Sequence, residues 1–556
     1  MEEKTKLNFT EEQFLTESIV SKYDYFENER CSQIADNALV RCSIYDSDIP
    51  KVNAWDCRIQ LPDIYELAQT LKSHLVQNLY SNPDGMFDVE GTDFETQKFA
   101  NKQKAMLVKT FESMKIQDEM EKIIDSVVET GEVTLFVGWE TKTRKTRRAV
   151  SLKEQSELNT SDTFVIEDKV IYDNAKVRFI NCEDFVFDRA EADNWDSCPK
   201  IYRTRMSFDE IKSNKSNNML NAEKLEILKG VLANKSRKNR KNNLQNKIEV
   251  LEYWGDIELP SGELLKNKLI AVAGRSILIR FEDNPYIINP FIHANIIESP
   301  ATGRGILPLR VALILNNISS TILNKQLDAL ALMMNPPYLA PKGCFKGEQD
   351  IHPGKIVEYD ATLMTAPPTP ISFDRAMQGW DFLNYFKSTI ESATGIFKNM
   401  AGNIQNFDRT ATEINYSVNG QEARLNMILE AINRKVIVPM VEKTAEIISN
   451  FKLGKESVLA NDRGKFFLVE IDDKVRNSSY VYHYGDRKAS FERKSKLKEL
   501  FDVVQSFAAN EQVNSRIDWL ECFKFAIEQY GIENANNFLT SEKENEQKPQ
   551  IDILKG

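Results

Sequence analysis

The sequence lacks the cysteine and histidine patterns that mark disulfide-stabilised or metal-binding proteins. Its seven cysteines are scattered with no C-x-x-C spacing, and its four histidines are too dispersed for an H-E-x-x-H pair. An odd number of scattered cysteines indicates neither a disulfide framework nor a zinc site. We therefore expect no metal and no cofactor.

Catalytic motifs are also missing. The chain has no G-x-x-x-x-G-K-[ST] phosphate loop, no G-x-G-x-x-G after a strand and no G-x-S-x-G elbow. Acidic clusters at residues 90–93 and 191–193 have the oxygen ligands that Mg²⁺ takes, but surface carboxylates are common in any acidic protein. We expect no enzymatic activity, with a metal-dependent nuclease as the alternative.

Long apolar runs are absent as well. The most apolar window, residues 306–315, is short and carries Arg310, whereas a membrane span needs about 20 apolar residues. The N-terminal stretch MEEKTKLNFTEEQFLTES is charged and lacks the apolar core of a signal peptide. The sequence therefore predicts a cytosolic protein that makes no membrane contact.

The chain has enough apolar material for two to four structural units. Of its 556 residues, 42% are hydrophobic and 28% charged, which is typical of a globular protein. Its net charge of −11 argues against tight wrapping by duplex DNA, because such binding depends on dense Lys/Arg surfaces. The same charge is compatible with a protein past which DNA slides.

The N-terminal half mixes helical and strand patterns. Residues 60–82 predict an amphipathic helix, and residues 94–129 a second helical stretch. Residues 131–150 read as a strand and the start of a hairpin, and residues 165–187 continue in strand style. Residues 248–280 read as a meander of short strands with turns at 260–262 and 273–274. The apolar positions of the first helix are Ile64, Leu67, Leu71, Leu75 and Leu79.

Two basic runs interrupt this region. One, on the arm of the predicted hairpin, comprises Lys142, Arg144, Lys145, Arg147 and Arg148; the other spans residues 235–247. A DNA-facing role and a solvated flexible loop are both compatible with such runs. The loop is favoured, because neither run interleaves the aromatic residues of a single-strand stacking platform.

A long helix and its return form the most distinctive pattern. Residues 303–334 predict one helix that is apolar on more than one face, as in helices buried among other helices. It ends at Asn335-Pro336-Pro337, and a second helix at residues 375–395 brings the chain back. Between them lies a β-rich segment with fixed turns, a stalk with a tip, whose prolines are Pro341, Pro353, Pro367, Pro368 and Pro370.

The segment 397–430 changes from a Gly/Asn-rich loop to a firmly started helix. Thr410 and Glu413 form an S/T-x-x-E capping box, so the helix should begin near Thr410, and Pro439 should kink or end it. Taken alone, the stretch also suits an ordinary helix–loop–helix connection. Strand-like residues 466–484, two helical segments at 490–510 and 515–529, and a polar tail follow.

This order of elements resembles the portal protein, or head-to-tail connector, of tailed bacteriophages, particularly the short-tailed group. NAWDCRIQLPDIYELAQTLKSHLVQNLYS is similar to the family's N-terminal Trp-then-Pro-then-helix segment, and GEVTLFVGWE to its central strand. GRGILPLRVALILNN, NPPYLAPKG and HPGKIVEYD resemble the stem helix entering the clip, and TATEINYSVNGQEARLNMILEAI the helix after the tunnel loop. The resemblance spans roughly residues 50–535.

The resemblance implies an α+β, mainly helical fold with portal-like wing, stem, clip and crown arranged in a ring oligomer. The wing would comprise residues 1–303 and 410–487, the stem helices 304–334 and 374–395, the clip 335–373, the tunnel loop 396–409, and the crown with the C-terminal tail 488–556. The run at 235–247 has no family counterpart that we can assign.

The resemblance also implies a function and partners. The family forms a ring, usually a dodecamer, at one capsid vertex, and serves DNA packaging, genome retention and ejection without catalytic activity. Partners would be other copies of the chain, the major capsid protein, the terminase large subunit, adaptor or tail proteins and double-stranded DNA. The protein would assemble in the host cytoplasm and reside in the virion.

Site residues follow from the same resemblance. The tunnel-loop residues expected at the DNA channel are Lys398, Asn403, Gln405 and Arg409, and the clip residues expected to dock partners are Lys342, Lys346, Glu348, Asp350 and Lys355. Lys398 and Arg409 suit phosphate neighbours, or else exposed charges flanking a helix. The alternative function from another class is a non-enzymatic helical scaffold that binds partner proteins through its proline-rich tip.

Overall fold

The computed structural model describes most of the chain in fourteen stretches. These are residues 7–45, 57–79, 85–149, 164–214, 216–238, 247–299, 304–306, 308–334, 338–339, 362, 369–370, 380–395, 424–462 and 465–484. The described residues hold more helix than strand, and the strands pair in antiparallel sheets, which is consistent with the predicted α+β class.

The helices of the described part vary widely in length. They are α1 (Phe9–Tyr45), α2 (Asp63–Leu79), α3 (Phe94–Met114), α4 (Ile116–Thr130), α6 (Phe208–Ser213), α7 (Ala222–Lys238), α8 (Arg310–Met334), α9 (Trp380–Thr394), α11 (Val438–Phe451) and α12 (Asp473–Arg476). Residues 424–432 are also helical and continue through a π-helical turn, Asn433–Ile437, into α11.

The strands pair antiparallel throughout. A five-stranded sheet has the order β4-β5-β6-β7-β8, a three-stranded sheet β3-β2-β9, and three two-stranded sheets pair β1 with β14, β10 with β11 and β12 with β13. The strands are β1 (Phe87–Gly91), β2 (Glu132–Ala149), β3 (Phe164–Ile180), β4 (Phe185–Phe187), β5 (Lys200–Ser207), β6 (Lys247–Glu258), β7 (Leu264–Ala273), β8 (Ile277–Asp283), β9 (Phe291–Asn295), β10 (Tyr338–Leu339), β11 (Thr369–Pro370), β12 (Glu456–Asp462), β13 (Lys465–Ile471) and β14 (Tyr480–Tyr484).

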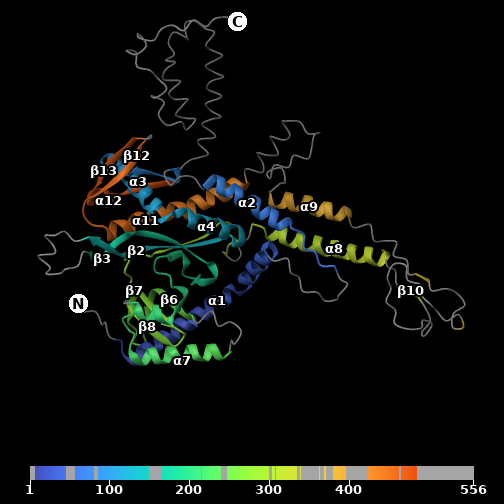
Figure 1. Cartoon of the computed structure of the whole chain (residues 1–556), viewed down its shortest axis with the longest axis horizontal. Helices are drawn as coiled ribbons and strands as arrows, with labels where there is room; N and C mark the ends of the chain where they lie inside the picture. The colour runs from blue at the N-terminus through green and yellow to red at the C-terminus, as the bar shows by residue number, and fades with distance from the viewer. Residues whose placement is uncertain are drawn as a thin grey trace, which may run out of the picture.

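The main core lies between the three-stranded sheet and the helices α2, α3, α4 and α11, and it extends to the bases of α8 and α9. The five-stranded sheet has two covered faces. The N-terminal half of α1 packs on one face, while α6 and α7 pack on the other. An aromatic cluster that includes Phe185, Trp254 and Phe291 joins the two sheets. Figure 1 shows α1 crossing from the five-stranded sheet towards α8.

Several sequence predictions are confirmed. All five apolar positions predicted for the helix at 60–82 are buried in α2, since burial at spacings of three and four residues places them on one face. The predicted hairpin is β2 paired with β3, and the predicted turns at 260–262 and 273–274 end β6 and β7. The first basic run lies on β2 and therefore on a strand arm, which corrects the preference for a flexible loop there.

Other predictions need correction. The stretch at 94–129 is two helices, because Lys115 takes a left-handed conformation, φ 53°, between α3 and α4. The long helix begins at Arg310 instead of near Gly303, since Gly305 forms a β-bridge with Glu298. Of the two outcomes predicted for Pro439, an end of the helix is wrong, because the helix runs on to Phe451. The proline disturbs the helix only locally, where a π-helical turn precedes it and accommodates the missing N–H. The capping box at Thr410 and the helices at 490–529 lie outside the described residues.

Candidate functional site

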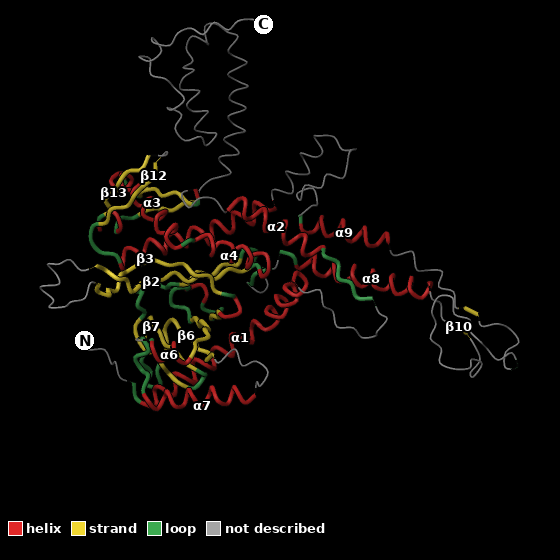
Figure 2. Tube along the Cα trace, viewed as in Figure 1, coloured by secondary structure: helices red, strands yellow, loops and turns green. Residues whose placement is uncertain are grey.

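Helices α8 and α9 form a pair that projects from the body of the molecule (Figure 1). Figure 2 shows the two helices side by side, leading to the short strand β10 at the far end of the pair. There Tyr338 pairs with Pro370 and Leu339 with Thr369, so the chain leaves α8 and returns towards α9 through a closed strand pair. The prediction of an outgoing helix followed by a returning helix is therefore confirmed by α8 and α9.

Large apolar side chains stay exposed on this pair. Near the base of α8, Val311, Ile314 and Ile318 follow a spacing of three and four residues, which places them on one face. A larger exposed set, which lies near the tip of α8 and on α9, comprises Leu330, Met333, Met334, Phe382 and Tyr385. Several exposed large apolar residues on one pair of helices indicate a surface that another protein covers.

An extended segment, Cys57–Leu61, binds to one face of α8; we call it the strap. Its alternate backbone amides donate to three polar side chains on successive turns of the helix. The Cys57 N–H donates to Asp328 at 2.7 Å, the Ile59 N–H to Asn324 at 2.8 Å and the Leu61 N–H to Ser320 at 3.1 Å. The Asn324 amide also donates to the Ile59 carbonyl at 3.0 Å.

The strap fits because the spacing of its alternate amides nearly matches the rise of one helical turn. Two residues of extended chain advance about 6.6 Å, and four residues of α-helix advance about 6.0 Å. Ser320, Asn324 and Asp328 are four residues apart, so each meets the next outward amide of the antiparallel strap. The contact fixes the helix pair to the segment that leads into α2.

The two ends of the undescribed segment 396–423 meet at the base of α9. Gly395 ends the helix in a left-handed conformation, φ 73°, and its N–H donates to the backbone carbonyl of Glu391. The guanidinium of Arg424 donates to the Ser392 carbonyl at 2.9 Å and to the Ala393 carbonyl at 3.3 Å. These are terminal carbonyls of a helix, which a cation stabilises. A side chain at Gly395 would contact Arg424, with its Cβ 3.0 Å from Cδ.

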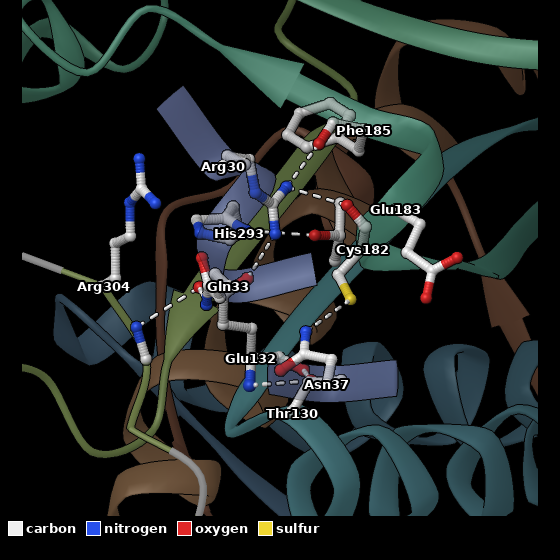
Figure 3. A network of polar contacts seen from close by, with 12 residues as sticks. Arg30, Gln33, Asn37, Thr130, Glu132, Cys182, Glu183, Phe185, His293 and Arg304 are labelled. Atoms are coloured by element: carbon white, nitrogen blue, oxygen red, sulfur yellow. Dashed lines mark hydrogen bonds and ion pairs between the residues drawn. The ribbon is translucent and has the colours of Figure 1, made fainter. Parts of the chain in front are cut away.

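A buried polar network anchors the base of α8 (Figure 3). Arg30 of α1 pairs with Glu132 of β2 at 2.7 Å and donates to the carbonyls of Cys182 and Phe185 at 2.7 and 2.6 Å. Glu132 also accepts from Gln33 and from the Gly305 N–H. The network therefore ties α1 and both sheets to the residues that lead into α8.

Gly305 is required in this network because nothing larger fits. A Cβ there would lie 2.5 Å from the Glu132 side chain and 2.9 Å from the Gly131 carbonyl. Next to it, Arg304 donates to the Glu29 carbonyl of α1. The backbone N–H of Gly305 therefore reaches the buried Glu132 carboxylate with no side chain in between. The hydrogen bond from Arg304 adds a second contact to α1.

Burial and charge set the protonation of this network. Burial opposes ionisation of Glu132, but Arg30 and the hydrogen bonds from Gln33 and Gly305 outweigh it, so the pKa of Glu132 is lowered. Burial lowers the pKa of His293 to about 4, and the neutral ring contacts the Thr134 hydroxyl at 3.0 Å. Burial raises the pKa of the Cys182 thiol. The network is suited to holding elements together, since a protonated thiol is a poor nucleophile.

None of the site residues predicted from the sequence can be placed. Residues 342–355 of the clip and 398–409 of the tunnel loop lie outside the described residues. Within the described stretches, no group of three or more His, Cys, Asp or Glu residues could hold a metal ion. No helix of those stretches is long and apolar enough to cross a membrane.

The sequence did not predict the strap, the Arg424 contact or the buried network. The spacing of Ser320, Asn324 and Asp328 is a usable signal, because three polar residues on one face of an apolar helix need partners. Their partners lie more than 250 residues earlier, so periodicity alone cannot identify them. Arg424 follows a Gly/Asn-rich stretch and carries no comparable signal.

Comparison with known proteins gives one family. No curated protein matches the sequence significantly. The family model of the phage SU10 portal protein matches residues 45–554, which include the strap, both projecting helices and the segments around them. Because this match covers nearly the whole sequence, the chain belongs to the phage SU10 portal protein family.

Proposed function

We propose that the chain assembles into a portal ring at one vertex of a phage capsid, where it serves DNA packaging, genome retention and ejection. In this proposal α8 and α9 are the stem helices, residues 335–373 the clip, 396–409 the tunnel loop, 488–556 the crown, and residues 1–303 with 410–487 the wing. The protein contributes structure and partner docking, and no catalytic step.

The observation that supports this function best is the projecting helix pair, together with the contact between Gly395 and Arg424, which flank the segment that contains the tunnel loop. The Arg30–Glu132 network fixes the residues that lead into α8, the strap holds the middle of α8, and Arg424 fixes the end of α9. A segment whose two ends are clamped at one point can change conformation without disturbing the helices. This is what a loop that touches moving DNA requires.

Two further features support a ring. The exposed apolar residues of α8 and α9 suit packing against neighbouring copies, because an assembled ring would remove them from water. The net charge of −11 per copy makes an acidic assembly, which repels duplex DNA and lets it slide instead of binding it tightly.

The roles of individual residues belong to the same proposal. Tunnel-loop residues Lys398, Asn403, Gln405 and Arg409 face the DNA, and clip residues Lys342, Lys346, Glu348, Asp350 and Lys355 dock first the terminase large subunit and later adaptor or tail proteins. The major capsid protein surrounds the ring. The ring is a dodecamer, as is usual in the portal proteins that the sequence resembles, and it forms in the host cytoplasm and remains in the virion.

Shortening the tunnel loop tests this function. Because Gly395 and Arg424 already lie together, removal of residues 397–408 leaves a segment that can still close, so rings should form normally. Packaged DNA per particle should fall, measured by nuclease-protected genome in particles carrying the variant. Normal genome filling would count against a tunnel role for this loop.

A further inference from the structure

The outer part of the β2–β3 hairpin stands without support from the rest of the described fold. We call it the ribbon, residues 141–147 of β2 with residues 166–171 of β3. The third strand of the sheet, β9, pairs with β2 only from Glu132 to Phe136, so it does not reach the ribbon. In Figure 1 the hairpin points away from the projecting α8–α9 pair. An isolated two-stranded ribbon is marginally stable in water.

The ribbon exposes apolar side chains as well as its strand edges. Ile166, Val170 and Ile171 are 65%, 51% and 59% exposed. Across the pairing, Ile166 lies opposite Arg147 and Val170 opposite Thr143, while Asp168 lies opposite Lys145. These six residues share one face because directly paired residues point to the same side. That face combines aliphatic side chains with two cations, which suits a protein surface.

The ribbon differs in charge from the rest of the molecule. It carries five basic residues, Lys142, Arg144, Lys145, Arg147 and Lys169, and two acidic ones, Glu167 and Asp168. Its charge is therefore +3, and because the whole chain carries −11, all remaining residues together carry −14. Another copy of this chain is acidic overall, and an acidic protein surface attracts the positively charged ribbon.

We propose that the ribbon docks on an acidic surface of the neighbouring copy of this chain in the ring. The proposal rests on the proposed portal function. A ring of more than two copies needs a heterologous interface, in which two different patches meet. A projecting cationic ribbon and an acidic body supply two such patches on one chain. Docking covers the aliphatic side chains and gives the ribbon the packing that it lacks alone.

Duplex DNA is the other acidic partner that the charge would fit, and two features disfavour it. Lys145 lies directly opposite Asp168 and Thr146 opposite Glu167, so carboxylates stand among the cations that would meet phosphates. Ile166, Val170 and Ile171 find no partner on a phosphate backbone. A protein surface accommodates both the aliphatic and the cationic side chains.

Two ribbon variants test the proposal independently. Ile166→Thr with Val170→Thr removes apolar contact but keeps β-branched residues that favour strands, and Lys145→Glu with Arg147→Glu reverses the cations. The matched control is Leu264→Thr with Lys266→Glu, at exposed positions of β7. We expect each ribbon variant to raise the concentration for half-maximal ring assembly by about tenfold or more, and the control to leave it unchanged.

Hydrogen exchange on the wild-type chain needs no variant. The amides at the open edges of residues 141–147 and 166–171 should exchange rapidly in the monomer and at least about tenfold more slowly in the ring. Unchanged exchange, or ribbon variants that assemble like wild type, would overturn the proposal. Normal assembly with weakened DNA binding would also overturn it, in favour of a DNA contact. A wild-type chain that forms no rings refutes the portal function itself and this proposal with it.

Discussion

Arg30 and Glu132 carry opposite charges inside the protein, with side chains 7% and 3% exposed. Moving either charge out of water is costly, and their pairing with the surrounding carbonyls, amide and N–H group offsets that cost. Removal of one partner leaves the other charge buried and unpaired. At the scale of single residues, this pair is therefore the most sensitive point among the polar contacts that hold α8 to the body.

Replacement of Glu132 tests this sensitivity. Glu132→Gln should reduce the free energy of unfolding by about 3–5 kcal/mol, because the Arg30 guanidinium loses its counter-charge. Urea unfolding of the variant and of wild type gives the difference. The control is Asp88→Asn, which removes the exposed pair with Lys104 and should cost about 0–1 kcal/mol. Equal losses in the two variants would contradict the assigned role of the network.

His293 should make stability depend on pH in a defined window. Its pKa is about 4 in the folded protein against 6.5 for the free side chain, so the unfolded chain binds a proton first as pH falls. Stability should therefore decrease between pH 6.5 and 4, by at most about 1.4 kcal/mol per pH unit. The pKa of Glu132 is lowered in the folded protein, so this residue adds a further loss of stability only below the ordinary pKa of 4.5.

Thermal unfolding at pH 7 and pH 5 measures the effect of His293. His293→Gln should reduce the difference in melting temperature between the two pH values relative to wild type. An unchanged pH dependence in the His293 variant would mean that this side chain is not held neutral in the folded protein.

At the scale of elements, a helix could be predicted from the sequence where its buried face is apolar along its whole length. Helix α2 was predicted because every buried position on its face is apolar. Helix α1 was missed because its buried stripe changes character: Tyr23 and Phe26 pack on the five-stranded sheet, and the next buried positions are Arg30 and Gln33. A search for periodic apolar residues does not detect such a helix, because its buried positions become polar where α1 enters the Arg30–Glu132 network.

The strap makes its own prediction at this scale. Asn324→Ala removes both hydrogen bonds to Ile59, so the strap should detach more often from α8. Trypsin should then cleave after Arg58 several-fold faster than in wild type, since cleavage requires local opening. Asn317→Ala, at an exposed position of the same helix, is the control. Equal cleavage rates in wild type and in the Asn324 variant would show that the Asn324 contact does not hold the strap.

At the scale of the whole molecule, the projecting pair was predictable and its attachment was not. Proline and glycine signals delimit α8 and α9 in the sequence, so a helix out and a helix home follow from local pattern. The strap, Arg424 and the Arg30–Glu132 network join residues far apart in the chain, and single-sequence periodicity does not report such contacts. The ring rests on the resemblance to portal proteins and on exposed apolar faces that a single copy leaves uncovered.

The most direct test of the portal function is the mass and shape of the purified chain in solution. One copy has a mass of 63.8 kDa, and we expect light scattering to report a species of about twelve copies. Negative-stain images should show rings with a central hole. A well-behaved monomer that forms no rings, even when capsid protein is added, would contradict the portal function and favour the scaffold alternative.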